Sequence, residues 1–159
     1  MELLVSLESS GFSTWLRESN SIWGYPTVLT LHTVGLALLV GANTVLDLRL
    51  LGFGRRLPLA ELAQAFRIMW IGFWINAVTG AMLFAADATT RGTTPLFQGK
   101  LLLVACGVIV ILLIRRQVFG DTPDRPRIGG AAKLLAATSL VVWIAAITAG
   151  RLMAYVYAT

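Results

Sequence analysis

Four long apolar stretches constrain this chain more than any other feature. They occupy residues 19–46, 68–86, 101–114 and 134–150, and the first carries no formal charge. A membrane-spanning helix needs about 20 mostly apolar residues, a length that the shorter stretches reach only with their flanking residues. With 57% hydrophobic residues and a mean hydropathy of +0.76, the chain is too apolar for an ordinary soluble domain. The sequence therefore predicts a membrane protein.

The predicted fold is all-α: an antiparallel bundle of four transmembrane helices in a single integral membrane domain. Short connections make sequential helices antiparallel neighbours. The third span is the weakest, and its alternative is a re-entrant or interfacial segment. The expected spans are residues 26–51, 62–86, 96–115 and 132–156 of 159. Ahead of them, apolar residues at roughly helical spacing predict a short interfacial helix: Phe12, Trp15, Leu16, Ile22 and Trp23.

Basic residues gather on one side of this predicted bundle. Nine of the thirteen flank the first and third connections: Arg49, Arg55, Arg56, Arg67, Arg115, Arg116, Arg125, Arg127 and Lys133. The other four are Arg17, Arg91, Lys100 and Arg151. The positive-inside rule then predicts a protein of the bacterial inner membrane with both termini outside the cytoplasm. Because topology accounts for the net charge of +5, a nucleic-acid partner is not expected.

The single histidine of the chain, His32, lies inside the first apolar stretch. An ionisable side chain in a spanning segment is costly, and by default it marks a functional site. At about 100° per residue, Asn43 lies within about 20° of His32 on the helix surface and Asp47 within about 60°. This polar face is expected to point into the bundle. There Asn43 would bond to Asn76 of the second span, and Asp47 would pair with Arg49.

Haem b is the cofactor that the surroundings of His32 favour. His32 lies about 9 Å below the start of its span, at about 1.5 Å per residue, and Tyr25 shares its face. Gly35, one turn away, would leave room for a flat macrocycle. Three cations on the same side of the membrane could neutralise haem propionates, although lipid phosphates are alternative partners: Arg91, Lys100 and Arg151.

The sequence does not decide the second axial ligand of the haem iron. The iron could be five-coordinate, could bind Met82 or Met153, or could bind His32 of a second copy. Copper is an alternative cofactor, because one imidazole and the thioethers of Met82 and Met153 suit Cu(I). In a third alternative, the imidazole is merely hydrogen-bonded to a neighbouring helix. The chain is then a structural membrane subunit that holds a lipid or a partner.

A family resemblance rests on residues 21–26 (Ser-Ile-Trp-Gly-Tyr-Pro), His32, Gly35, Gly41 and residues 47–52. This pattern resembles small four-helix bacterial membrane proteins known as a domain of unknown function. The similarity extends through Asn76, Gly80 and residues 97–100. The chain is also similar, more weakly, to membrane b-type cytochromes and copper-resistance D domains, where a histidine is followed by glycines. That resemblance implies haem or copper at His32, although this chain lacks the further histidines of such proteins.

Together these patterns predict a haem-b-binding membrane protein for electron transfer or redox sensing. No catalytic residues are predicted, because the chain has no nucleotide-binding glycine loop and no Ser/His/Asp set in plausible register. One histidine supplies half of a common ligand set, so a homo-oligomer, most simply a dimer, is expected. Gly35 and Ala42 would bring two first helices close together. Alternatively, these small residues only let the helices of one chain pack.

Overall fold

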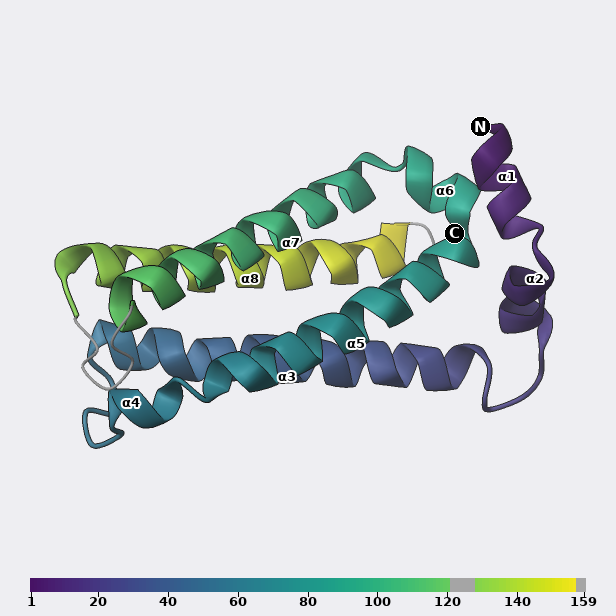
Figure 1. The fold of residues 1–159 in the computed structure, drawn as a ribbon. Coiled ribbons are helices and arrows are strands. Elements are labelled where there is room, and N and C mark those ends of the chain that lie inside the picture. Colours follow the sequence, from purple (N-terminus) through teal and green to yellow (C-terminus); the bar gives the residue numbers. More distant parts are fainter. Residues whose placement is uncertain (121–127, 157–159) are drawn as a thin grey trace.

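The computed structural model describes residues 1–120 and 128–156, and four long antiparallel helices dominate it (Figure 1). They are α3 (Tyr25–Leu51), α5 (Ala65–Ala85), α7 (Pro95–Ile114) and α8 (Gly130–Val156). By length and apolar composition, four helical segments in these residues can cross a membrane. The predicted fold, an all-α bundle of four spanning helices, is confirmed.

Shorter helices connect and flank the long ones. They are α1 (Glu2–Glu8), α2 (Gly11–Glu18), α4 (Leu59–Leu62), α6 (Ala88–Thr93) and a π-helical turn that extends α7, η1 (Arg115–Phe119). We call the end of the bundle where α4 lies the α4 end, and the opposite end, where α6 lies, the α6 end. Helices α1 and α2 lie at the α6 end (Figure 1).

The sequence explains where the long helices begin and end. Pro26 and Pro95 stand in the first turns of α3 and α7, where a missing N–H needs no partner. Gly52 ends α3 in the left-handed conformation, with φ of 108°, which a side chain would strain. Helix α7 runs for 20 residues without a break, so the third span is not a re-entrant segment.

The predicted interfacial helix is α2, but it ends at Glu18 and leaves Ile22 and Trp23 outside it, and a further helix, α1, precedes it. Ser10 separates them, because its side chain accepts the Ser13 backbone N–H at 3.3 Å and so caps α2. Leu16 is fully buried beside Leu83, whereas Trp15 on the same helix is 47% exposed. Helix α2 is therefore amphipathic, as an interfacial helix must be.

The four long helices form two pairs, α3 with α5 and α7 with α8. At the first interface, a Cβ atom added to Gly35 would lie 2.9 Å from the Gly72 carbonyl oxygen. At the second, a Cβ on Gly107 would lie 2.8 Å from the Trp143 ring. Backbones and rings approach this closely only because both positions are glycine. Small residues of this kind let helices pack tightly inside a membrane.

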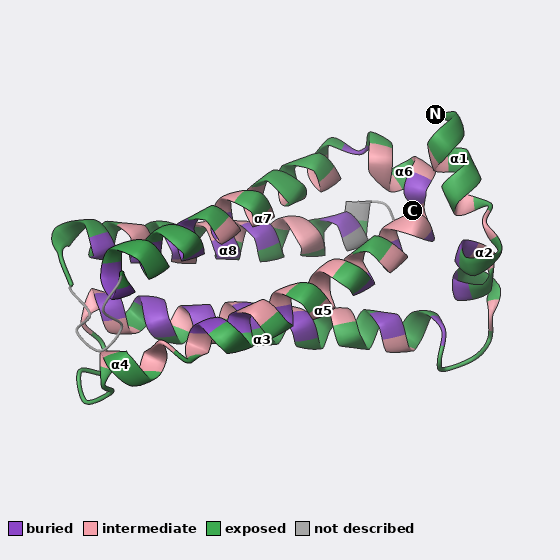
Figure 2. Ribbon diagram, viewed as in Figure 1, coloured by how far each residue is buried: buried purple, intermediate pink, exposed green. Residues whose placement is uncertain are grey.

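Apolar side chains cover the outside of the bundle as well as its inside. Figure 2 shows exposed residues along the outer faces of all four long helices. Many of them are large and apolar, such as Trp74 at 62%, Leu102 at 67% and Val141 at 67% exposure. A surface of this size and character would be unstable in water and suits lipid. The chain therefore has the surface of a membrane protein.

Two predicted contacts of α3 do not form. Arg49 does not pair with Asp47, because its guanidinium donates to the Leu57 and Arg55 carbonyls at 2.8 and 3.3 Å. Asn43 does not bond to Asn76, since their partners lie at different depths of the bundle. Residues 121–127 of the long third connection, with Arg125 and Arg127, fall outside the described residues.

Candidate functional site

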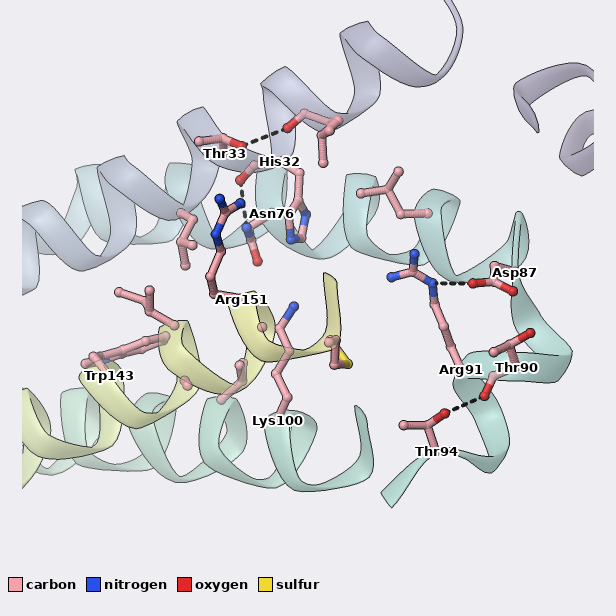
Figure 3. A pocket seen from close by; sticks show the side chains of 18 of the residues that line it. His32, Thr33, Asn76, Asp87, Thr90, Arg91, Thr94, Lys100, Trp143 and Arg151 are labelled. Atoms are coloured by element: carbon pink, nitrogen blue, oxygen red, sulfur yellow. Dashed lines mark hydrogen bonds and ion pairs between the residues drawn. The ribbon is translucent and has the colours of Figure 1, made fainter. Parts of the chain in front are cut away.

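A cavity of about 540 Å³ lies at the α6 end, between the α3/α5 pair and the α7/α8 pair. Its walls come from α3, α5, α6, α7 and α8. The structure brings together there most of the residues singled out in the sequence: Tyr25, His32, Arg91, Lys100, Arg151 and Met153. Figure 3 shows the His32 ring and the Lys100 side chain directed into this space from opposite walls.

The orientation of the His32 ring is set by α5. Its Nδ1 lies 3.1 Å from the Thr79 hydroxyl oxygen. The Thr79 hydroxyl has a single hydrogen, and the Ile75 carbonyl lies closest to it at 2.6 Å, so we assign Nδ1 as the donor in the contact with Thr79. In a neutral ring with hydrogen on Nδ1, the lone pair is on Nε2. No hydrogen bond to Nε2 is found within residues 1–120 and 128–156.

Two further α5 residues fix the position of His32. The Asn76 amide donates to the His32 backbone carbonyl at 2.8 Å. A Cβ on Gly80 would lie 3.1 Å from Cε1 of the imidazole, so any side chain there would press against the ring. The Thr79 hydroxyl thus fixes the imidazole, and the missing side chain of Gly80 leaves space for it. It is half-buried and in contact with the cavity.

Positive charge dominates the cavity lining. Arg91 pairs with Asp87 at 3.1 Å, and Asp87 is the one carboxylate among the described lining residues. Arg151 lies over the Tyr155 ring at 5.2 Å and donates to its hydroxyl at 3.1 Å. The Lys100 stem runs along α8, because a Cβ on Gly150 would lie 3.5 Å from Lys100 Nζ. Three cations face one carboxylate, which favours an anionic ligand.

The inner end of the cavity is apolar. Leu36, Val104 and Ile147 line it together with Trp143, which is 2% exposed. The Trp143 indole N–H has no hydrogen-bond partner in the described part of the chain. The cations of the lining lie nearer the α6 end of the bundle, and these apolar residues lie deeper in it. A ligand with an apolar body and an anionic end therefore matches the cavity.

A family of unknown function, DUF6644, matches residues 22–156 of the chain. The chain belongs to the DUF6644 family. No curated protein and no solved structure matches it. The match includes the four long helices and every lining residue of the cavity, while α1 and α2 precede it. The predicted resemblance to small four-helix proteins of unknown function is confirmed.

Two of the predicted site residues lie away from the cavity of this DUF6644 protein. Gly35 faces Gly72 inside the α3/α5 interface, so it gives room to a helix backbone and not to a macrocycle. Met82 packs against the small apolar cluster that contains Leu16 and Leu83. The predicted copper ligands His32, Met82 and Met153 therefore do not line one cavity.

Three residues of the DUF6644 site were not predicted from the sequence. The contact of Thr79 with His32 depends on the α3/α5 crossing, which a single sequence does not give. No role at a site was predicted for Asp87 or Trp143, because an acidic residue after a span and an aromatic residue within one are common. Only the packing of the helices brings Asp87 and Trp143 to the cavity and Thr79 to His32.

Proposed function

We propose that this DUF6644 protein binds haem b in the cavity at the α6 end, with His32 Nε2 as an axial ligand. One observation supports this most. The imidazole donates from Nδ1 to Thr79, and its other nitrogen has no partner in the described residues while the ring borders a cavity of about 540 Å³. Histidines that bind metals almost always donate their second ring N–H to a neighbouring acceptor.

The residues around His32 fit this group. The volume lies within the range of roughly 300–1,000 Å³ that is usual for small-molecule and cofactor sites. Leu36, Val104 and Trp143 would pack against the apolar ring system. Lys100 and Arg151 would bind the propionates through charge-assisted hydrogen bonds. When bound, haem b would supply a one-electron iron couple, which suits electron transfer or redox sensing.

The structure favours one of the three predicted arrangements of the second axial ligand. Met153 lines the same cavity as His32, whereas Met82 does not. Histidine with methionine is an established haem ligand pair. We therefore propose Met153 as the second ligand. A Met153→Leu variant should keep bound haem but change its spectrum, because leucine fills the volume without a thioether.

The test of haem binding is the absorption spectrum of protein purified from a haem-replete host. The wild type should show a Soret band, and His32→Ala should lose it, with partial recovery when free imidazole is added. Thr30→Ala is the matched control, because Thr30 is an exposed residue of the same helix. A wild type that is colourless although fully expressed and folded would overturn the proposal.

A structural subunit without a cofactor is the second candidate, and the His32–Thr79 hydrogen bond favours it as well. In that case His32→Ala would reduce stability and change no spectrum. Copper has less support, because its three proposed ligands do not line one cavity. Elemental analysis would show copper by a metal content that falls in His32→Ala.

We also propose the orientation that the basic residues imply, with the α4 end in the cytoplasm and both termini outside. Single cysteines at Leu57 and Gly99, in a Cys106→Ala background, would test it. Both positions are exposed, at opposite ends of the bundle. An impermeant thiol reagent added outside intact cells should label Gly99→Cys and spare Leu57→Cys. The reverse pattern would invert the orientation.

The proposed dimer no longer has support from the two small residues chosen for it. Gly35 contacts α5, and Ala42 packs against the core of its own chain. The dimer remains a proposal that rests on the single histidine. The mass of the protein in mild detergent, together with crosslinking in native membranes, would decide between a dimer and a monomer.

A further inference from the structure

A second polar cluster lies near the α4 end, away from the cavity. It consists of Asn43 and Asp47 on α3 and Ser139 on α8, with exposures of 1%, 0% and 0%. The Asn43 amide nitrogen donates to Asp47 Oδ2 at 2.6 Å and to the Ser139 hydroxyl oxygen at 2.8 Å. These contacts join two helices that belong to different pairs.

This cluster has more hydrogen-bond acceptors than donors. Both hydrogens of the Asn43 amide are used, yet Asn43 Oδ1 and Asp47 Oδ1 are buried without any hydrogen-bond partner in the described chain. Two acceptors thus lack a donor. A buried unpaired acceptor costs about 1–3 kcal/mol, and an unpaired buried carboxylate costs more.

Charged side chains do not fill this gap in the residues that the structure describes. No ion pair of Asp47 is found there, and the nearest cation in the sequence, Arg49, bonds to backbone carbonyls. The other charged groups of the elements at this end are all exposed: Arg55, Arg56, Glu61, Arg67, Arg115, Arg116 and Lys133. Among the described groups nothing neutralises a carboxylate at Asp47, so a bound proton or a bound ion must do so there.

The space around the cluster favours the proton. Neither of the two cavities described for the molecule is lined by Asn43, Asp47 or Ser139. Calcium and magnesium take about six or more oxygen ligands, and only two oxygens are spare here. Nor does the described chain hold a group of three His, Cys, Asp or Glu side chains that could bind a metal. A proton needs no such room.

We propose that Asn43, Asp47 and Ser139 form a proton-binding site in which Asp47 is a neutral carboxylic acid at neutral pH. The carboxylate takes one proton from water at the α4 end and returns it there, with no other bond made or broken. Asp47 is four residues from the end of α3, about 6 Å at about 1.5 Å per residue. This site is independent of haem, because it shares no residue with the cavity.

Dicyclohexylcarbodiimide tests the proposal, because this apolar reagent adds to protonated carboxyl groups in apolar surroundings. The full-length protein in liposomes should gain the acylurea mass on the Asp47 peptide at neutral pH. Labelling should fall as the pH is raised and should not change with added NaCl. Asp47→Asn should lose it entirely. Glu61→Gln is the matched control and should keep it, since it removes an exposed carboxyl group at the same end of the bundle. Protection by NaCl at constant pH would make this a cation site and overturn the proposal.

Infrared spectroscopy covers the case in which the reagent cannot reach Asp47. The wild type at neutral pH should show the C=O stretch of a protonated carboxyl group, and Asp47→Asn should lose that band. Ser139→Ala should shift the band without abolishing it, because Asn43 still donates to Asp47. A wild-type spectrum at neutral pH without a protonated-carboxyl band assignable to Asp47 would refute the proposal whatever the labelling result.

Discussion

The two ends of α3 handle buried polar groups in opposite ways. At the α6 end, His32 borders an open cavity whose described lining holds three cations and one carboxylate. At the α4 end, Asn43 and Asp47 are sealed from solvent and hold two acceptors without donors. The His32 end has an excess of positive charge beside a cavity, whereas the Asp47 cluster has an excess of acceptors and lines neither described cavity. A polar group in a membrane bundle can thus be accommodated by a ligand or by its neighbours.

Side-chain size accounts for this difference. Beside His32 and Lys100 stand glycines, Gly80 and Gly150, which leave the imidazole and the ammonium free to reach the cavity. Toward the α4 end, α3 instead contributes Leu46 and Leu50 to the main apolar core, both fully buried. Small residues therefore make room at one end, and large ones close the other.

The largest effect is expected from Gly72→Leu, which would disturb both ends together. The new Cβ would lie 2.6 Å from the Leu39 backbone nitrogen, so α3 and α5 would have to separate. We expect a loss of about 3 kcal/mol of unfolding free energy, the upper part of the usual overpacking range. Unfolding in detergent mixtures followed by circular dichroism measures it. Gly41→Leu is the control, because nothing lies within 4 Å of a Cβ there. Equal stability of the two variants would contradict the close α3/α5 contact.

Asn43→Leu should affect the α4 end alone. It removes the donor to Asp47 and Ser139 and leaves both without that hydrogen bond. The expected cost is about 2 kcal/mol of unfolding free energy. Ligand binding at His32 should stay at the wild-type level in the same preparation. A stable variant with impaired ligand binding would mean that the Asn43 cluster and the His32 cavity are energetically coupled.

Thr79→Val should give the complementary result at the α6 end. Valine keeps the volume but cannot accept the His32 Nδ1 hydrogen, so the ring is no longer held in one tautomer. Haem titration should show about tenfold weaker binding, or about 1.4 kcal/mol. Thr79→Ser retains the hydroxyl and should bind as the wild type does. Equal affinities for the valine and serine variants would show that this hydrogen bond does not orient the ligand.

The smallest effect concerns the contact of α1 with α6. Glu8 accepts hydrogen bonds from the Thr89 hydroxyl and backbone N–H, and these bonds lower the pKa of Glu8 below its ordinary value of 4.5. The contact therefore contributes stability above pH 4.5 and loses it as the pH falls through the lowered folded pKa. Hydrogen exchange at the Thr89 amide should accelerate in acid. Glu8→Gln should show the same exchange in acid and at neutral pH once intrinsic rates are corrected.

The sequence predicted the helices well and their contacts poorly. Apolar length and flanking charge locate a span, because the bilayer imposes both on each helix separately. Helix length and antiparallel order also suffice to bring His32, Lys100 and Arg151 to one end. A helical wheel gives the face of a residue but not its partner. Asn43 therefore received Asn76 as a partner, whereas the crossing of α3 and α8 gives it Ser139.

Glycine positions show the same limit. Gly35 was predicted to make room for a cofactor or for a second copy of the chain. Its neighbour is Gly72, and that contact depends on the register between α3 and α5. A single sequence specifies that a small residue is present, but the surface it faces depends on the relative rotation of two helices.

The position of the cavity between two helix pairs makes any bound ligand a crosslink. The His32, Thr79 and Asn76 contacts belong wholly to the α3/α5 pair, whereas Lys100 and Arg151 belong to the α7/α8 pair. A molecule that contacts residues of both pairs links the α3/α5 pair to the α7/α8 pair. At a concentration one hundred times its dissociation constant, such a ligand adds about 2.7 kcal/mol to the stability of the folded state. Thermal melting of the purified protein is thus a screen for its natural occupant, whatever colour that occupant has.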